Sequence, residues 1–140
     1  MTTAKKEVTL TLRLTAEEAA QLAALAALRQ SKPASIGSRF VSEGVRRARF
    51  PAIDFRDGEP GRVAYLAGSR LPVWLIVSLL EECDGDLDQA ARHWGRPKPL
   101  LQAALQYAEA YPAEIQSALA LHEGRTFEAL KQRLPGLERL

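Results

Sequence analysis

A short alternating segment near the N-terminus constrains the fold more than any other feature of this sequence. Between residues 8 and 14 apolar and polar side chains alternate, so an extended backbone places the two sets on opposite faces. A lone strand leaves its backbone donors and acceptors unpaired, and the nearest partner is the same strand of a second copy. We therefore predict an antiparallel two-stranded ribbon across a homodimer. Its apolar face is Val8, Leu10, Leu12 and Leu14, and its outward polar face is Thr9, Thr11 and Arg13.

Two helices are predicted between this strand and residue 50. Thr15 and Glu18 have the capping-box spacing that begins a helix, and Pro33 ends that helix because proline disfavours helix in the residue before it. Ser35 is the expected cap of the second helix, whose first turn holds no acid and leaves backbone N–H groups open to an anion. An ordinary serine cap on a solvated helix explains Ser35 equally well. The apolar stripes are Ala19, Leu22, Leu25, Ala26 and Leu28, then Ile36, Phe40, Val41, Val45 and Ala48.

The order of these features resembles that of ribbon-helix-helix repressors over the first third of the chain, with Thr15 and Ser35 at the two helix starts. The resemblance implies that the dimeric ribbon lies in the DNA major groove, where Thr9, Thr11 and Arg13 contact base edges. It also implies that residues before the strand and at the start of the second helix contact DNA phosphates. These are Lys5, Lys6, Ser35, Gly37, Ser38 and Arg39.

The charge of the chain is unevenly distributed, although the total is only +2. Residues 1–50 hold nine Lys or Arg and four Asp or Glu, residues 51–112 hold six and nine, and residues 113–140 hold four of each. A dimer brings two copies of the basic first segment together, which favours a polyanion such as the DNA backbone. The acidic middle segment, residues 51–112, does not favour a polyanion.

A change of composition at Phe50-Pro51 marks the expected boundary of a second domain. Val63 and Tyr65 are predicted in the second arm of a small hairpin, after a turn rich in Gly and Pro. Three short helices follow, and their number and connections are compatible with a helix-turn-helix. The first is expected to begin at Pro72, the second to follow a cap at Asp86, and the third to run from about Pro99 to Tyr111.

Residues 68–73 read Gly-Ser-Arg-Leu-Pro-Val and resemble the signature of the domain of unknown function 433 family. The resemblance extends from about Phe55 to Ile115. It implies a small helical domain with a helix-turn-helix-like arrangement, and many members of that family accompany toxins of the PIN-like ribonuclease type and are interpreted as their antitoxins. Leu66-Ala67 departs from the family pattern, which has an apolar residue and then an arginine there.

The third helix of this domain is a poor electrostatic match to DNA. Its exposed positions carry one positive and one negative charge, within a segment whose net charge is negative. Groove-reading helices normally lie among several Lys or Arg phosphate contacts, so a protein partner or a dimer contact is favoured here. The exposed positions are Lys98, Gln102, Gln106 and Glu109.

The C-terminal segment 113–140 carries an amphipathic stripe that is typical of a helical tail. Such a segment can dock into a hydrophobic groove of another chain, as antitoxin tails do, or it can fold back onto its own domain. The expected partner-binding residues are Phe127, Leu130, Arg133, Leu134 and Leu137.

The sequence indicates neither a catalytic nor a metal site. His93 and His122 are far apart and share no local cluster with cysteines or carboxylates. The alternating acids of residues 84–88 suggest a calcium loop, but Gln89 and Gly95 stand where such a loop needs Gly and Glu. We expect no enzyme, no cofactor and no metal. No apolar run approaches the length of a membrane span and the N-terminus lacks the apolar block of a signal peptide, so we expect a cytoplasmic protein.

These features predict a mainly α chain in three parts: a ribbon-helix-helix module in 1–50, a helix-turn-helix-like domain with a short hairpin in 51–112, and a helical tail in 113–140. The expected function is that of an antitoxin, which neutralises a PIN-like ribonuclease toxin and represses its own operon. A free-standing dimeric regulator with an oligomerisation or sensing domain is the alternative. In a third interpretation the first fifty residues only dimerise. The expected partners are a second copy, operator DNA and the toxin.

Overall fold

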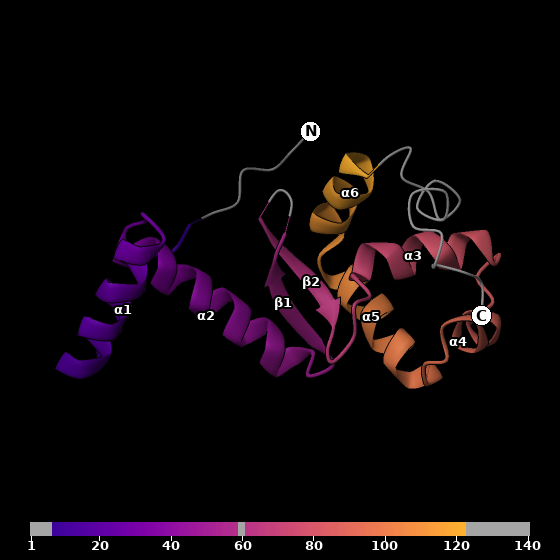
Figure 1. The fold of residues 1–140 in the computed structure, drawn as a ribbon, viewed down its shortest axis with the longest axis horizontal. Coiled ribbons are helices and arrows are strands. Elements are labelled where there is room, and N and C mark those ends of the chain that lie inside the picture. Colours follow the sequence, from indigo (N-terminus) through magenta and orange to yellow (C-terminus); the bar gives the residue numbers. More distant parts are fainter. Residues whose placement is uncertain (1–6, 59–60, 123–140) are drawn as a thin grey trace. The chain divides into compact units, whose positions relative to one another are not determined.

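The computed structural model describes residues 7–58 and 61–122 (Figure 1). Those ranges are mainly helical and contain six helices and one two-stranded antiparallel sheet, so the predicted mainly α class is confirmed. The elements are α1 (Ala16–Leu28), α2 (Pro33–Arg49), β1 (Ile53–Asp57), β2 (Arg62–Leu66), α3 (Val73–Glu82), α4 (Leu87–Trp94), α5 (Lys98–Ala110) and α6 (Pro112–Leu121).

The chain forms two compact units, Met1–Ser42 and Glu43–Leu140, and the division lies inside helix α2. The sequence places this division at Phe50-Pro51, where α2 has just ended. The division lies earlier because the last turns of α2 bond to the second unit. The carboxylate of Glu43, for example, accepts two hydrogen bonds from the guanidinium of Arg62 on β2.

Helix α1 begins as the sequence predicts. The backbone N–H of Glu18 donates to the hydroxyl of Thr15 over 3.1 Å, and the backbone N–H of Thr15 donates to Oε1 of Glu18 over 3.3 Å. These two bonds satisfy helix donors that would otherwise lack acceptors. After the helix, Gln30 has a positive φ of 52°, and the break that was expected before Pro33 follows.

The first helical residue of α2 is Pro33, so the cap position is Lys32 and the predicted cap at Ser35 is wrong by three residues. The carbonyl oxygen of Lys32 accepts hydrogen bonds from the backbone N–H groups of Ser35 and Ile36, each over 3.1 Å. Proline suits the first helical position because its φ is already helical and its missing N–H would have no acceptor there. Ser35 therefore lies inside the first turn.

The predicted hairpin is confirmed, and one face of it covers the core of the second unit. Strands β1 and β2 pair with Ile53 opposite Leu66 and Phe55 opposite Ala64, and all four side chains are buried. Helix α5 contacts both strands, and α3 contacts β2 and α5 (Figure 1). The most deeply buried side chains of these helices are Val73, Leu101, Ala104 and Tyr107.

The start of α4 also matches the sequence prediction. Asp86 caps the helix by accepting a hydrogen bond from the backbone N–H of Gln89 over 3.1 Å. Gly95 ends it in the left-handed conformation, with a φ of 61° that residues with a Cβ disfavour. The third helix of this unit, α5, has nearly the predicted bounds.

Helix α6 belongs to the core of the second unit, although the sequence predicts a separate tail from residue 113 on. Ile115 is buried in the same cluster as Tyr107, and α6 contacts α3 and α5. The ring of Trp74 on α3 also stacks on that of His122, which directly follows α6, with 4.1 Å between centroids. The second unit therefore needs α6 to close its core.

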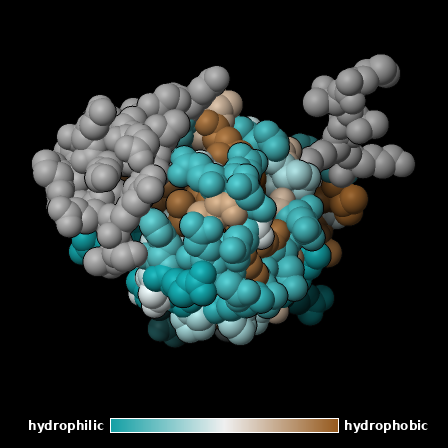
Figure 2. Space-filling view, turned by 90° about the vertical axis from the view of Figure 1, so that its right-hand side faces the viewer, coloured by the Kyte–Doolittle hydropathy of each residue, from teal (hydrophilic) through white to brown (hydrophobic). Residues whose placement is uncertain are grey.

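The face of the second unit seen in Figure 2 is mainly hydrophilic, with hydrophobic residues in small separate patches. Within residues 7–58 and 61–122, no helix combines the length and the apolar character that a membrane crossing requires.

Candidate nucleic-acid interface

The segment from Val8 to Leu14, which carries the predicted base contacts, forms no strand within one chain. No backbone hydrogen bond joins it to any other part of the described chain. Its apolar side chains are exposed, Val8 by 85% and Leu10 by 73%. The segment thus offers the open backbone donors and acceptors of an unpaired strand edge.

A groove of about 950 Å³ runs along this segment within the first unit. Every second residue, from Val8 to Leu14, lines the groove, whereas Thr9, Thr11 and Arg13 do not. The alternation in the sequence therefore separates an apolar and a polar side of the segment. Helices α1 and α2 supply the rest of the lining, including Leu22, Leu25, Gly37, Phe40 and Val41.

The first unit buries few side chains. Among its described residues only Ala26 and Ile36 are buried, while Leu28 is 82% exposed and does not join the predicted stripe of α1. Phe40 and Val41 on α2 are each 42% exposed. Full burial of one such side chain stabilises a fold by about 1.5–3 kcal/mol, so one copy leaves most of its available hydrophobic stabilisation unused.

The predicted phosphate contacts divide into three groups. Lys5 and Lys6 lie outside the described residues. Ser35 and Arg39 lie in the first half of α2, whose first turn carries no acid. Because the helix begins at Pro33, Gly37 and Ser38 lie beyond the first turn and line the apolar groove instead. Their backbone N–H groups are therefore not the free donors of a helix start.

Gly37 lies beside α1 in the groove. A Cβ at this position would stand 3.5 Å from Cδ2 of Leu22 on α1, which is ordinary van der Waals contact. An alanine would therefore fit there without moving either helix.

Three basic residues at the end of α2 bind groups of the second unit. Arg46 pairs with Glu114, Arg47 pairs with Asp54 over 2.9 Å, and Arg49 donates to the hydroxyl of Tyr111 over 3.1 Å. They were counted in the basic balance of residues 1–50. The charge that remains for a polyanion is therefore smaller than the sequence suggested.

Tyr107 lies at the centre of the network around Arg46. Its hydroxyl donates to a carboxylate oxygen of Glu114 and accepts a hydrogen bond from Arg46 over 2.8 Å. Burial raises the pKa of Tyr107 well above its ordinary value, and the Glu114 carboxylate raises it further. The hydroxyl stays protonated and joins α2 to α5 and α6.

Sequence reasoning missed both networks, Arg46–Tyr107–Glu114 and Glu43–Arg62. The sequence did hold one signal for the Glu43–Arg62 ion pair. Glu43 follows Ile36 by seven residues and Phe40 by three, so it lies on the apolar stripe of α2. A carboxylate at such a position needs a buried partner, which is Arg62.

The remaining candidates are placed as follows. The predicted partner-binding residues Phe127, Leu130, Arg133, Leu134 and Leu137 lie outside the described residues. Within the described ranges, no three His, Cys, Asp or Glu side chains lie close enough to hold a metal ion.

Comparison of the chain with models of known protein families, with curated proteins and with solved structures found no match.

Proposed function

We propose that this protein is the antitoxin of a type II toxin-antitoxin pair, in which a dimer binds operator DNA with its N-terminal ribbon and neutralises a toxin with its C-terminal half. One observation carries the DNA-binding part. The segment from Val8 to Leu14 has an unpaired backbone, an apolar row facing a groove, and Thr9, Thr11 and Arg13 away from that groove.

A second copy satisfies both needs of this segment. Antiparallel pairing of the two segments supplies backbone partners, and the two apolar rows cover each other and the groove. The polar sides then form a six-residue surface of threonines and arginines, whose hydroxyl and guanidinium groups suit base edges in a major groove. Ser35 and Arg39 remain the proposed phosphate contacts on α2.

The toxin-binding part rests on the sequence. Residues 68–73 resemble the signature of a family with many antitoxins, and the stripe from Phe127 to Leu137 is typical of a segment that docks in a groove. A PIN-like ribonuclease is the proposed toxin. The proposed arrangement of α3, α4 and α5 is helix-turn-helix-like, with a protein partner rather than DNA on its outer surface.

Co-expression with the product of the adjacent reading frame tests the toxin-binding part. We expect a stable complex that co-elutes in size-exclusion chromatography and that loses its ribonuclease activity. A matched variant, Leu130→Glu with Leu134→Glu, should weaken the complex, whereas Thr11→Ala should leave it intact. If the neighbouring gene encodes no small nuclease and no complex forms at several stoichiometries, the antitoxin proposal fails.

A free-standing dimeric regulator is the second candidate, and one observation favours it. The second unit builds its own core from β1, β2, α3, α5 and α6. A complete core is what an oligomerisation or sensing domain requires. DNA binding without any neighbouring toxin would support this candidate.

A further inference from the structure

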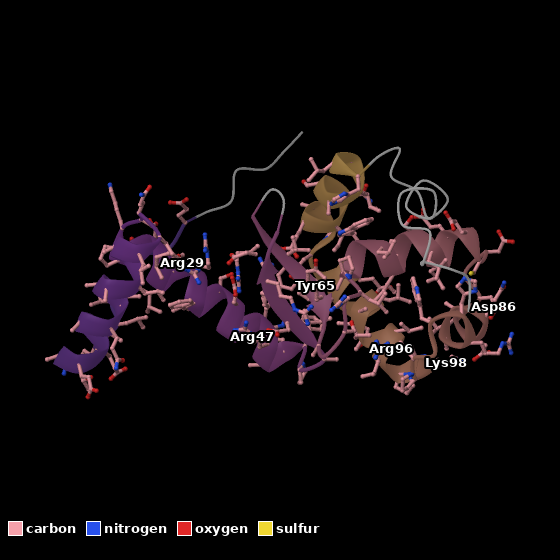
Figure 3. The ribbon with its side chains drawn as sticks, in the orientation of Figure 1. Arg29, Arg47, Tyr65, Asp86, Arg96 and Lys98 are labelled. Atoms are coloured by element: carbon pink, nitrogen blue, oxygen red, sulfur yellow. The ribbon has the colours of Figure 1, made fainter. Side chains whose placement is uncertain are left out.

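Three arginines of the second unit meet in one open pocket that the proposed function does not use. The pocket has a volume of about 580 Å³ and is lined by Arg56, Arg70, Arg96, Trp94 and the loop of residues 68–71. Arg56 comes from β1, Arg70 from the loop before α3, and Arg96 from the turn between α4 and α5, where Figure 3 labels it. We call this site the arginine pocket.

The three guanidinium groups are not neutralised by the described residues. None of them forms an ion pair there, whereas three other arginines of the same unit do. The pKa of Asp54 is lowered, first because its carboxylate accepts a hydrogen bond from the backbone N–H of Phe55, and then by Arg47 and, last, by the charge of Arg56. The ion pair of this carboxylate is with Arg47, at 2.9 Å. The arginine pocket therefore concentrates positive charge within a segment whose net charge is negative.

The backbone that carries Arg70 is fixed from within. The hydroxyl of Ser69, which is only 4% exposed, donates to the carbonyl of Leu66 over 2.7 Å and accepts from the backbone N–H of Leu71 over 3.0 Å. Gly68 has a φ of +73°, a backbone conformation that residues with a side chain rarely adopt. These contacts thus fix the backbone at Arg70 before any ligand arrives.

Contacts also fix the backbone at Arg96 and orient the side chain of Arg56. Gly95 turns the chain out of α4, and the backbone N–H of Arg96 then donates to the carbonyl of Ala91 over 3.1 Å. The guanidinium of Arg56 lies 4.8 Å from the ring centroid of Tyr65, which Figure 3 labels on β2. This cation–π contact orients Arg56 without cancelling its charge. Fixed backbone positions at Arg70 and Arg96 and an oriented Arg56 reduce the entropy that is lost when the pocket binds an anion.

The chemistry of the pocket favours phosphate over carboxylate. Guanidinium groups bind either anion through paired N–H donors, but three of them offer more donors and charge than one carboxylate can use. A phosphate has more acceptor oxygens and up to two negative charges. Trp94 adds a half-buried aromatic surface on which a base can stack.

We propose that the arginine pocket binds a nucleotide, with its phosphate between Arg56, Arg70 and Arg96 and its base on Trp94. The nucleotide is either free or part of a nucleic-acid strand, and both present the same phosphate and base. The first source would make the second unit a sensing domain, and the second would give the protein a nucleic-acid contact separate from the ribbon.

Tryptophan fluorescence of the full chain tests this proposal. The sequence holds two tryptophans, so Trp74→Phe leaves Trp94 as the only one. In this background the protein is titrated with inorganic phosphate, adenosine monophosphate, adenosine triphosphate and a short single-stranded oligonucleotide. We expect the nucleotides to change the Trp94 emission, and Arg70→Gln or Arg96→Gln to weaken their binding about tenfold or more.

Arg92→Gln is the matched control. Arg92 is exposed in the last turn of α4 and does not line the pocket, so the same loss of charge should change affinity by no more than about twofold. In the oligonucleotide arm all proteins also carry Arg13→Ala, so that the N-terminal module contributes little. Binding of mononucleotides identifies a free nucleotide as the source, and binding of the oligonucleotide alone identifies a strand.

Three results would overturn the proposal. The first is the absence of any binding by the nucleotides and the oligonucleotide. The second is equal binding by folded Arg70→Gln, Arg96→Gln and Arg92→Gln proteins. The third is that a poly-glutamate peptide, titrated in the same way, binds as tightly as the nucleotides, which would make the pocket a site for an acidic protein. Circular dichroism of each variant verifies that it is folded.

Discussion

At the scale of single residues, Tyr107 joins three helices of the second unit: its own helix α5, the end of α2 and α6. It is fully buried, its hydroxyl bonds to Arg46 and Glu114, and its ring packs edge-on against Phe50 and Phe55. A hydroxyl so placed must find partners, because an unpaired buried polar group is destabilising. The residue therefore couples the end of α2 to α5 and α6.

Tyr107→Phe removes this hydroxyl and leaves the ring in place. We expect the free energy of unfolding to fall by about 1–3 kcal/mol, because Arg46 and Glu114 each lose a part-buried hydrogen bond. Tyr111→Phe is the matched control, since its hydroxyl accepts only from the exposed Arg49, and should change stability by less than about 0.5 kcal/mol. Urea denaturation measures both. Equal effects of the two variants would contradict this role.

The same hydroxyl predicts a pH dependence. Burial and Glu114 raise the pKa of Tyr107 above its ordinary value of 10.0, so the folded chain keeps a proton that the unfolded chain loses. The contribution to stability is fully present below pH 10 and decreases as the pH rises towards the folded pKa, by up to about 1.4 kcal/mol per pH unit. Urea midpoints of the wild type should fall more steeply above pH 10 than those of Tyr107→Phe. Parallel curves would exclude this effect.

At the scale of elements, α2 belongs to both units, and the ion pair of Glu43 with Arg62 fixes its second half. The side chain of Glu43 is 7% exposed and accepts hydrogen bonds of 2.9 and 2.7 Å from Arg62, whose own side chain is 22% exposed. Arg47 lies farther from the same carboxylate, at 3.7 Å, and is 46% exposed.

Arg62→Ala should therefore destabilise the second unit much more than Arg47→Ala. The first leaves a nearly buried carboxylate without its main partner, at a cost of about 1.5–3 kcal/mol. The second removes exposed ion pairs, which stabilise by at most about 1 kcal/mol. Thermal denaturation of the two variants compares them. If Arg47→Ala were the more destabilising, the assignment of partners to Glu43 would be wrong.

Local signals in the sequence were enough for most element boundaries. The capping box at Thr15, the cap at Asp86 and the turn at Gly95 each act within a few residues, and each marks a helix end in the structure. The start of α2 was misplaced because two signals competed there. Ser35 offers a cap, but Pro33 already fits the first helical position and Lys32 supplies the carbonyl.

Local signals could not predict contacts between segments that are far apart in the sequence. Arg46 meets Tyr107 and Glu114, which are more than sixty residues away in the chain. The arginine pocket likewise draws on three separate segments, and Arg56, Arg70 and Arg96 show no common spacing in the sequence. A charge count over windows of sequence cannot tell a paired arginine from an unpaired one.

At the scale of the whole molecule, a second copy completes the first unit in the proposed ribbon. Leu12→Glu places a charge in the apolar row that lines the groove, and we expect it to shift sedimentation from dimer to monomer, because an isolated buried carboxylate is strongly unfavourable. Thr11→Glu is the matched control. It adds the same charge on the polar side of the segment and should leave the dimer intact. A monomeric wild type would refute the ribbon.

The most direct test of the central proposal is a DNA-binding titration with the promoter region upstream of this protein's own gene, followed by fluorescence anisotropy at low salt. Arg13→Ala should weaken binding about thirtyfold or more, since each good base contact contributes about 1–3 kcal/mol of discrimination and a dimer presents two arginines. Arg29→Ala, which removes a charge just after α1, should have a much smaller effect. If the wild type shows no affinity for this DNA, or if Arg13→Ala binds as tightly as the wild type, the N-terminal segment is not a DNA-reading ribbon.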